Sequence, residues 1–180
     1  MDPSIPATTT PTASATSVSP TTPDERQIAG FLARLRDNQN FGAAIAGGLA
    51  SAIIGAVLWA VLTVLTNFEI GWEAIGVGFL VGFGVRKLGR GIDPVFGYLG
   101  AILSLGGIAL GNILTGMAVI ATHNHMSLMD VAVHLNPSNT WMLLTAGFTP
   151  IDALFYGLGI YYGYKYSFHR PTAEELSTLR

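Results

Sequence analysis

The sequence predicts an all-α membrane protein with four transmembrane helices and a cytoplasmic N-terminal amphipathic helix. Three observations lead to this fold class. Only 11% of the 180 residues are charged, against roughly 25% in an ordinary soluble domain, so charged side chains are too few to cover a water-facing surface. Two long stretches carry no charge at all, and the nine Lys and Arg residues all fall on one side of a four-span topology.

The N-terminal part of the chain divides into a tail and a short helix. Residues 1–23 contain seven Thr, four Ser and five Pro, which predicts a disordered tail, because this composition buries too little apolar surface to offset chain entropy. Thr22-Pro23-Asp24-Glu25 is a helix-start signal, and it opens a helix predicted over residues 24–39. The apolar positions of that helix are Ile28, Phe31, Leu32 and Leu35. This pattern is typical of a helix lying on a membrane surface, and equally of a helix packed against its own protein.

The predicted transmembrane domain covers residues 40–168. The uncharged stretches 41–67 and 94–122 contain 27 and 29 residues, more than the ~20 needed to cross a bilayer. The four expected spans are residues 41–66, 70–86, 94–121 and 150–166, followed by a cytoplasmic tail over 169–180. A short outer helix is expected over residues 140–148.

Two of these elements leave alternatives open. Glu73 lies 13 residues before Arg86, about 20 Å along a helix and short of the ~30 Å hydrocarbon core. Either the second span begins nearer Phe68 and submerges Glu73, or the bilayer thins around it. The sequence Thr149-Pro150-Ile151-Asp152 is a second helix-start signal; one long kinked helix from Thr140 is the competing interpretation.

The distribution of charge predicts the orientation. With four spans, every Lys and Arg lies on the same side as the two termini, and none lies on the other side. The positive-inside rule then places both termini in the cytoplasm. The loop after the first span and the loop around residues 123–139 would face outward.

Small residues form stripes on the second and third predicted spans. The stripe residues are Gly78 and Gly82 on the second span, and Gly100, Ser104, Gly107 and Gly111 on the third. In lipid, such stripes let helix backbones approach closely. They predict packing within one four-helix subunit, or, for one of the stripes, a contact between copies of the chain.

Two runs of sequence carry a resemblance to a known group of proteins. The first is Ala74-Ile-Gly-Val-Gly-Phe-Leu-Val-Gly-Phe-Gly-Val-Arg86, continued by Gly89-Arg-Gly-Ile-Asp93 and Phe96-Gly-Tyr-Leu-Gly100. The second extends from Thr149-Pro-Ile-Asp-Ala-Leu-Phe-Tyr-Gly157 to Tyr164-Lys-Tyr-Ser-Phe168. Over roughly residues 70–170 the chain resembles an uncharacterised family of small, polytopic bacterial integral membrane proteins. The resemblance implies a bacterial cytoplasmic (inner) membrane protein and carries no activity.

Four polar residues are candidates for contact with ions or a pore. Glu69 and Glu73 lie one helical turn apart and would form an acidic ring in an oligomer, unless both belong to the outer turn. Asn112 lies in the middle of the third span and is expected to find an interhelical partner or to line a pore. Asp152 fits a helix-capping role, with ion or proton binding as the alternative.

Other polar groups predict little chemistry. His123, His125 and His134 are weak candidates for a metal site, because their spacing matches no strong ligand signature, and Ser127 and Asp130 form a capping box instead. Arg86, Lys87 and Arg90 are expected to meet anionic lipid headgroups.

Composition and motifs exclude several function classes. The chain has no cysteine and a net charge of −2, which excludes thiolate chemistry and argues against nucleic-acid binding. No catalytic motif is present, so we expect no enzyme activity and no cofactor. The first functional hypothesis is a glycine-packed homo-oligomer that forms a small channel. The alternative is a non-catalytic accessory subunit of a larger membrane complex, and the expected partners are membrane lipid and either the chain itself or another membrane protein.

Overall fold

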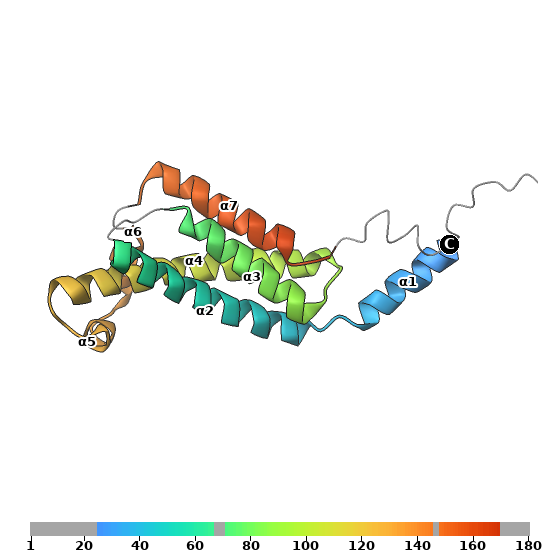
Figure 1. The fold of residues 1–180 in the computed structure, drawn as a ribbon, viewed down its shortest axis with the longest axis horizontal. Coiled ribbons are helices and arrows are strands. Elements are labelled where there is room, and N and C mark those ends of the chain that lie inside the picture. Colours follow the sequence, from blue (N-terminus) through green and yellow to red (C-terminus); the bar gives the residue numbers. More distant parts are fainter. Residues whose placement is uncertain (1–24, 67–70, 146–147, 170–180) are drawn as a thin grey trace, which may run out of the picture.

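A computed structural model describes residues 25–66, 71–145 and 148–169 of the chain. Within these ranges 85% of the residues are helical and none forms a strand, which confirms the all-helical prediction. The longest helices lie side by side with their axes roughly aligned, as Figure 1 shows. These are α2 (Phe41–Thr66), α3 (Glu73–Gly89), α4 (Pro94–His123) and α7 (Pro150–Tyr166). The shorter helices are α1 (Glu25–Asp37), α5 (Leu128–Val133) and α6 (Pro137–Thr145).

The four long helices form two parallel pairs. Gly48 of α2 contacts Leu103 of α4, and Trp59, further along α2, contacts Gly111, further along α4. These two helices therefore run in the same direction. α3 and α7 run in the opposite direction. α3 and α4 both contact all three other long helices, whereas α2 and α7 lie on opposite sides of them.

Among the described residues, two helices have the length and apolar composition of membrane spans. They are α2, with 26 residues, and α4, with 30 residues, and they match the predicted spans 41–66 and 94–121. The helices α6 and α7 also meet these criteria when taken together, but their directions differ by 99°. The structure therefore has two separate helices in this region, with α7 beginning at Pro150 as the start signal predicts.

Many large apolar side chains face outward, while small residues fill much of the interior. On α2 the buried residues are mostly Ala and Gly, whereas Ile53, Ile54, Leu58 and Leu65 are exposed. The core between the helices combines Ala and β-branched residues, with Val81, Val85 and Ile108 fully buried, and also contains the aromatic side chains of Trp59, Phe96 and Phe168. A helix whose outer surface is this apolar is suited to lipid rather than water.

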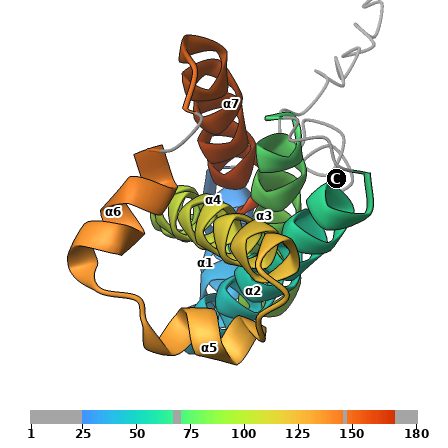
Figure 2. The ribbon, with the colours of Figure 1, turned by 90° about the vertical axis from the view of Figure 1, so that its left-hand side faces the viewer.

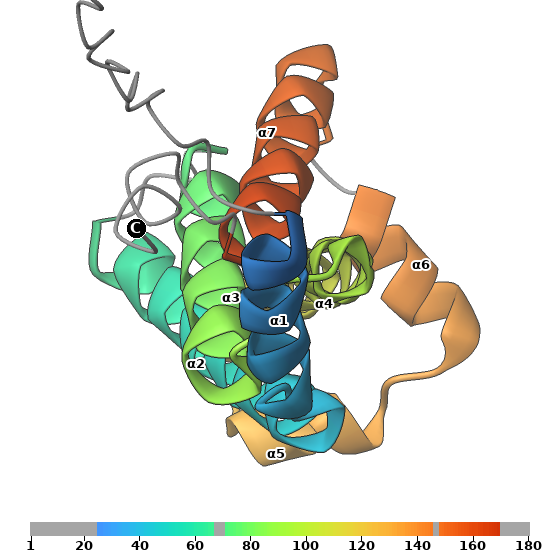
Figure 3. The same ribbon diagram turned by 90° about the vertical axis from the view of Figure 1, so that its right-hand side faces the viewer.

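The short helices lie at the two ends of the bundle. α1 extends beyond the end at which α2 begins (Figures 1 and 3), and its residues Ile28, Phe31, Leu32 and Leu35 are half-buried. α5 and α6 lie at the opposite end, against α4 (Figure 2). Several boundaries differ from those expected: α3 begins at Glu73 rather than residue 70, and α6 covers Pro137–Thr145 rather than 140–148. Propensity and capping place helix ends only to within a few residues.

Candidate functional site

The stripe on α3 packs against α7. A Cβ added to Gly78 would collide with the backbone of Gly159, and one added to Gly82 would lie 3.1 Å from the carbonyl oxygen of Gly163. Gly78 and Gly82 are both buried. Such close approach of two backbones requires residues without a side chain on both helices.

The stripe on α4 contacts three helices in turn. A Cβ added to Gly100 would be 2.5 Å from the carbonyl oxygen of Gly163 on α7. One added to Gly107 would be 2.9 Å from Val77 on α3 and 3.2 Å from Ala52 on α2. Gly111 lies against the indole of Trp59. The residue between them, Ser104, is fully buried beside Gly163. The six predicted packing residues thus all make contacts inside a single chain.

Asn112 has the interhelical partner that its position predicts. Its side-chain Nδ2 donates to the hydroxyl oxygen of Tyr156 on α7 at 2.7 Å, and also lies 3.3 Å from the carbonyl oxygen of Ile108. Tyr156 in turn packs edge-on against Trp59, with ring centroids 6.5 Å apart. The amide therefore joins α4 to α7 within the bundle.

Glu73 lies at the start of α3, where its carboxylate accepts a hydrogen bond from the Thr63 hydroxyl on α2 at 3.4 Å. Thr63 is buried and Glu73 is half-buried. Glu69, the other half of the expected acidic pair, lies outside the described residues. One helical turn before Thr63, the indole of Trp59 is 2% exposed, and its Nε1 has no hydrogen-bond partner.

Asp152 binds to the first turn of its own helix. Its carboxylate accepts hydrogen bonds from the backbone N–H of Thr149 at 2.8 Å and from the Thr149 hydroxyl at 2.7 Å. This geometry satisfies groups that a helix start otherwise leaves unpaired. Both contacts lie within one helix start, so they join α7 to no other element.

The three candidate histidines do not converge. His134 makes its contact with the backbone oxygen of Asp130 at 2.7 Å, and His125 has a positive φ of 54° in the loop before α5. The carboxylate of Asp130 accepts from the backbone N–H of Ser127 at 3.3 Å. Across residues 25–66, 71–145 and 148–169, no three His, Asp or Glu side chains gather in a way that would hold a metal ion.

The basic candidates lie at the opposite end of the bundle. Arg86 and Lys87 occupy the last turn of α3, and Arg90 follows with a left-handed φ of 50°. All three are exposed, and Arg86 Nη2 lies 2.9 Å from Nδ1 of His169. Because an arginine only donates, Nδ1 of His169 is the acceptor of this hydrogen bond.

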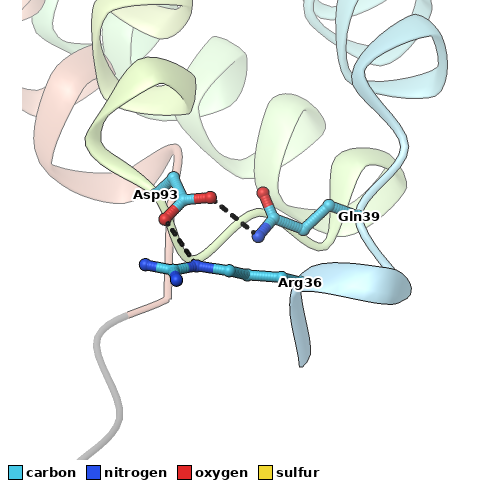
Figure 4. A network of polar contacts seen from close by, with 3 residues as sticks. All are labelled: Arg36, Gln39 and Asp93. Carbon is cyan, nitrogen blue, oxygen red and sulfur yellow. Dashed lines mark hydrogen bonds and ion pairs between the residues drawn. The ribbon is translucent and has the colours of Figure 1, made fainter. Parts of the chain in front are cut away.

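The sequence reasoning missed a polar network at this same end. The carboxylate of Asp93 accepts from Arg36 Nε at 3.3 Å and from Gln39 Nε2 at 3.0 Å (Figure 4). The backbone N–H of Asn40 also donates to the carbonyl oxygen of Gly89 at 2.9 Å. Together these contacts join the last turn of α1 and the segment that follows it to the end of α3 and the turn before α4. The Asp-Pro pair that opens α4 marks Asp93 as a helix start, but nothing in the pattern indicates partners more than 50 residues away.

Apolar grooves are the remaining features that could receive a ligand. One, of about 620 Å³, lies between α2 and α4 near the loop that precedes α5. Another, of about 610 Å³, lies along α3 between α2 and α7 and includes Glu73 and Trp59 in its lining. Both are bordered almost wholly by apolar side chains, as expected for surfaces in contact with lipid or with another membrane protein.

The described residues therefore form a packed bundle, and apolar grooves lie on its outside. Its interior hydrogen bonds and glycine contacts join helices of one chain. Comparison with protein-family models, with curated proteins and with solved structures found no match, so the family resemblance over residues 70–170 stays a prediction and adds no function to these residues.

Proposed function

We propose that the chain is a four-span protein of the bacterial inner membrane that serves as a non-catalytic subunit of a larger membrane complex. The observation that carries this proposal is that the small-residue stripes pack against helices of the same chain. Gly78, Gly107 and Gly111 contact other helices of the same chain, so they are already occupied and are not available to join copies into a pore. The surface left for a partner is the apolar outside of the bundle.

The four-span topology draws support from the directions of the helices. α2 and α4 are long enough to cross a membrane and lie parallel. A chain that crosses twice in the same direction has to return between the two crossings, and α3 is the segment that connects them. α7 then runs back beside α4, which puts Lys165 at the same end as Arg86 and Arg90. Under the positive-inside rule, this arrangement predicts that both termini lie on the cytoplasmic side of the membrane.

The topology is tested by labelling introduced cysteines, since the chain has none of its own. Ser138→Cys in α6 and Arg90→Cys after α3 are both at exposed positions. We expect an impermeant maleimide to label Ser138→Cys in intact cells and Arg90→Cys only after permeabilisation. Labelling of both variants from the outside would contradict the topology.

The accessory role is tested by native mass spectrometry of the protein extracted gently from its own membrane. A stoichiometric second protein is the expected result. A partner-contact variant should be placed at an exposed position such as Ile102 on α4, which is 68% exposed. A change at Gly107 is unsuitable, because it would disturb the contact with Ala52 inside the bundle and so confuse lost binding with lost folding.

A homo-oligomeric channel is the second candidate, and Glu73 is the residue that favours it. Its half-buried carboxylate borders an open groove, where an adjacent copy would meet it. Rings of acidic side chains attract cations in channels. A single closed homo-oligomer in the mass spectrum, together with ion flux that Glu73→Gln alters, would support this function and contradict the accessory role.

A further inference from the structure

The groove along α3 combines an apolar floor with two polar groups at different depths. It is bordered by Leu58 and Leu62 of α2, by Phe79 of α3 and by Leu158 of α7. With a volume of about 610 Å³, it has the size of a small-molecule site. It opens sideways, toward the surface that faces the bilayer in the proposed topology.

The first polar group is the carboxylate of Glu73. It lies at the outer end of the groove, beside Trp72, and the Thr63 hydroxyl donates to it. In the proposed topology this end of α3 faces the outer leaflet, at the level where lipid headgroups meet the acyl region. A carboxylate at this depth attracts a cationic group, because the surrounding low dielectric strengthens the interaction between opposite charges.

The second polar group is the indole N–H of Trp59, a residue whose side chain borders the same groove, although the nitrogen itself is covered by neighbouring atoms. Trp59 is 2% exposed and its Nε1 has no partner. The indole meets Gly111 through Cε3, Cδ2 and Cζ3, atoms that lie across the ring system from Nε1. A buried donor without an acceptor is costly, and an acceptor supplied by a ligand in the groove would remove this cost.

The spacing of these two groups defines the kind of ligand. Trp59 lies four residues before Thr63 on α2, which is about 6 Å deeper along the helix axis. A ligand that satisfies both groups has a cationic head, a carbonyl oxygen several ångströms below it and an apolar chain. We propose that this groove binds a phospholipid whose headgroup carries a primary ammonium. The ammonium contacts Glu73, an ester carbonyl accepts from Trp59 Nε1, and an acyl chain covers the apolar floor.

A primary ammonium fits this site better than a trimethylammonium. It carries N–H donors, one of which can donate to the carboxylate of Glu73, whereas a trimethylammonium has none to give. The expected preference is therefore for phosphatidylethanolamine over phosphatidylcholine. An anionic headgroup such as phosphatidylglycerol is repelled by the carboxylate.

The proposal depends on the membrane embedding proposed above, but not on the accessory role. It is tested by native mass spectrometry of the purified full chain in detergent. Phosphatidylethanolamine, phosphatidylcholine and phosphatidylglycerol with identical acyl chains are titrated separately. We expect phosphatidylethanolamine to bind on the order of five- to tenfold more tightly than phosphatidylcholine, the effect of one charge-assisted hydrogen bond at a half-exposed carboxylate.

Variants separate the two contacts. Glu73→Gln keeps an acceptor for Thr63 but removes the charge, and should abolish the preference between the two zwitterionic lipids. Trp59→Phe should weaken both lipids alike and leave their ratio unchanged. The matched control is Asp130→Asn, which removes an acidic residue outside the groove and should change neither affinity nor ratio.

Three results would overturn the proposal. They are equal affinity of the wild-type chain for the two lipids, a preference that persists in Glu73→Gln, or a chain-to-chain dimer that excludes lipid from the groove. A melting curve for each variant distinguishes lost binding from lost folding. Absence of a partner protein in the membrane extract would count against the accessory role and leave this lipid measurement unaffected.

Discussion

Gly78 leaves no space for even one methyl group. An added Cβ would collide with the backbone of Gly159 on α7, whereas the same addition to Gly76, half a turn away on α3, meets nothing within 4 Å. Because backbone cannot move aside as the end of a side chain can, Gly78→Ala should destabilise the bundle by about 1–3 kcal/mol, the cost of overpacking a filled core.

Gly76→Ala is the matched control for this prediction. It adds the same atoms to the same helix and should be neutral or slightly stabilising, because alanine is the better helix former by about 1 kcal/mol. Thermal unfolding in detergent compares the two variants. Equal melting temperatures for them would show that α3 and α7 do not approach as closely as described.

At the scale of residues, the sequence predicts contacts between near neighbours in the chain better than contacts between distant residues. The capping contacts of Asp152 and Asp130 involve groups three residues apart, so spacing alone predicts them. Asn112 is different: its position predicts an interhelical partner, but Tyr156 lies 44 residues away, and pattern alone does not select it. The unpaired indole N–H of Trp59 is likewise a property of its three-dimensional surroundings.

At the scale of single elements, the start of α7 depends on Asp152. Its carboxylate accepts from the backbone N–H and the hydroxyl of Thr149 and lies at the positive end of the helix dipole. Asp152→Ala should destabilise the first turn by about 0.5–1 kcal/mol. Hydrogen exchange measured by mass spectrometry should show faster exchange at residues 150–154 and unchanged exchange at the far end, near Gly163.

Asp152→Asn provides the control, since an amide oxygen still accepts from Thr149 while the charge is lost. It should recover part of the protection. If Asp152→Ala instead slowed exchange, or altered it evenly along α7, the carboxylate would have a role other than capping.

Elements were easier to predict than the contacts between them. Uncharged length predicts α2 and α4, and the Thr-Pro-x-Asp signal predicts the first residue of α7. The small-residue stripes predict close packing, but the position of a glycine does not indicate which helix will pack against it. Whether Gly100 faces α7 or a second copy of the chain depends on how four helices fit together, and this is a property of volume and shape rather than of periodicity.

At the scale of the whole molecule, Asp93 ties α1 to the bundle. It accepts from Arg36 and Gln39, and as the residue before α4 it makes no capping bond with its side chain. Asp93→Ala should therefore release α1 without weakening α4. Because the ion pair is largely exposed, with 62% of the Arg36 side chain accessible, the global stability should change by less than about 1 kcal/mol.

Spin labels give the measurement for this prediction. Ala33→Cys on α1 and Val95→Cys on α4 are both at exposed positions, and no native cysteine competes for the label. The distance distribution between them should broaden in Asp93→Ala, and raised salt should broaden it in the parent chain, since exposed charges are screened. A distribution unchanged by either treatment would mean that other contacts hold α1.

The glycine content of α3 has a consequence for how the protein is made. Five of its 17 residues are glycine, and each lowers the intrinsic stability of a helix by about 1 kcal/mol relative to alanine. A newly synthesised α3 that leaves the ribosome after α2 is therefore a poor helix on its own, and α4 and α7, the other neighbours on which it packs, have not yet been translated. We therefore expect α3 to reach its final position late, after those helices have been made. In the proposed four-span topology, the helices of this chain would then not insert as a series of independent steps, because the crossing formed by α3 depends on partners that lie downstream of it.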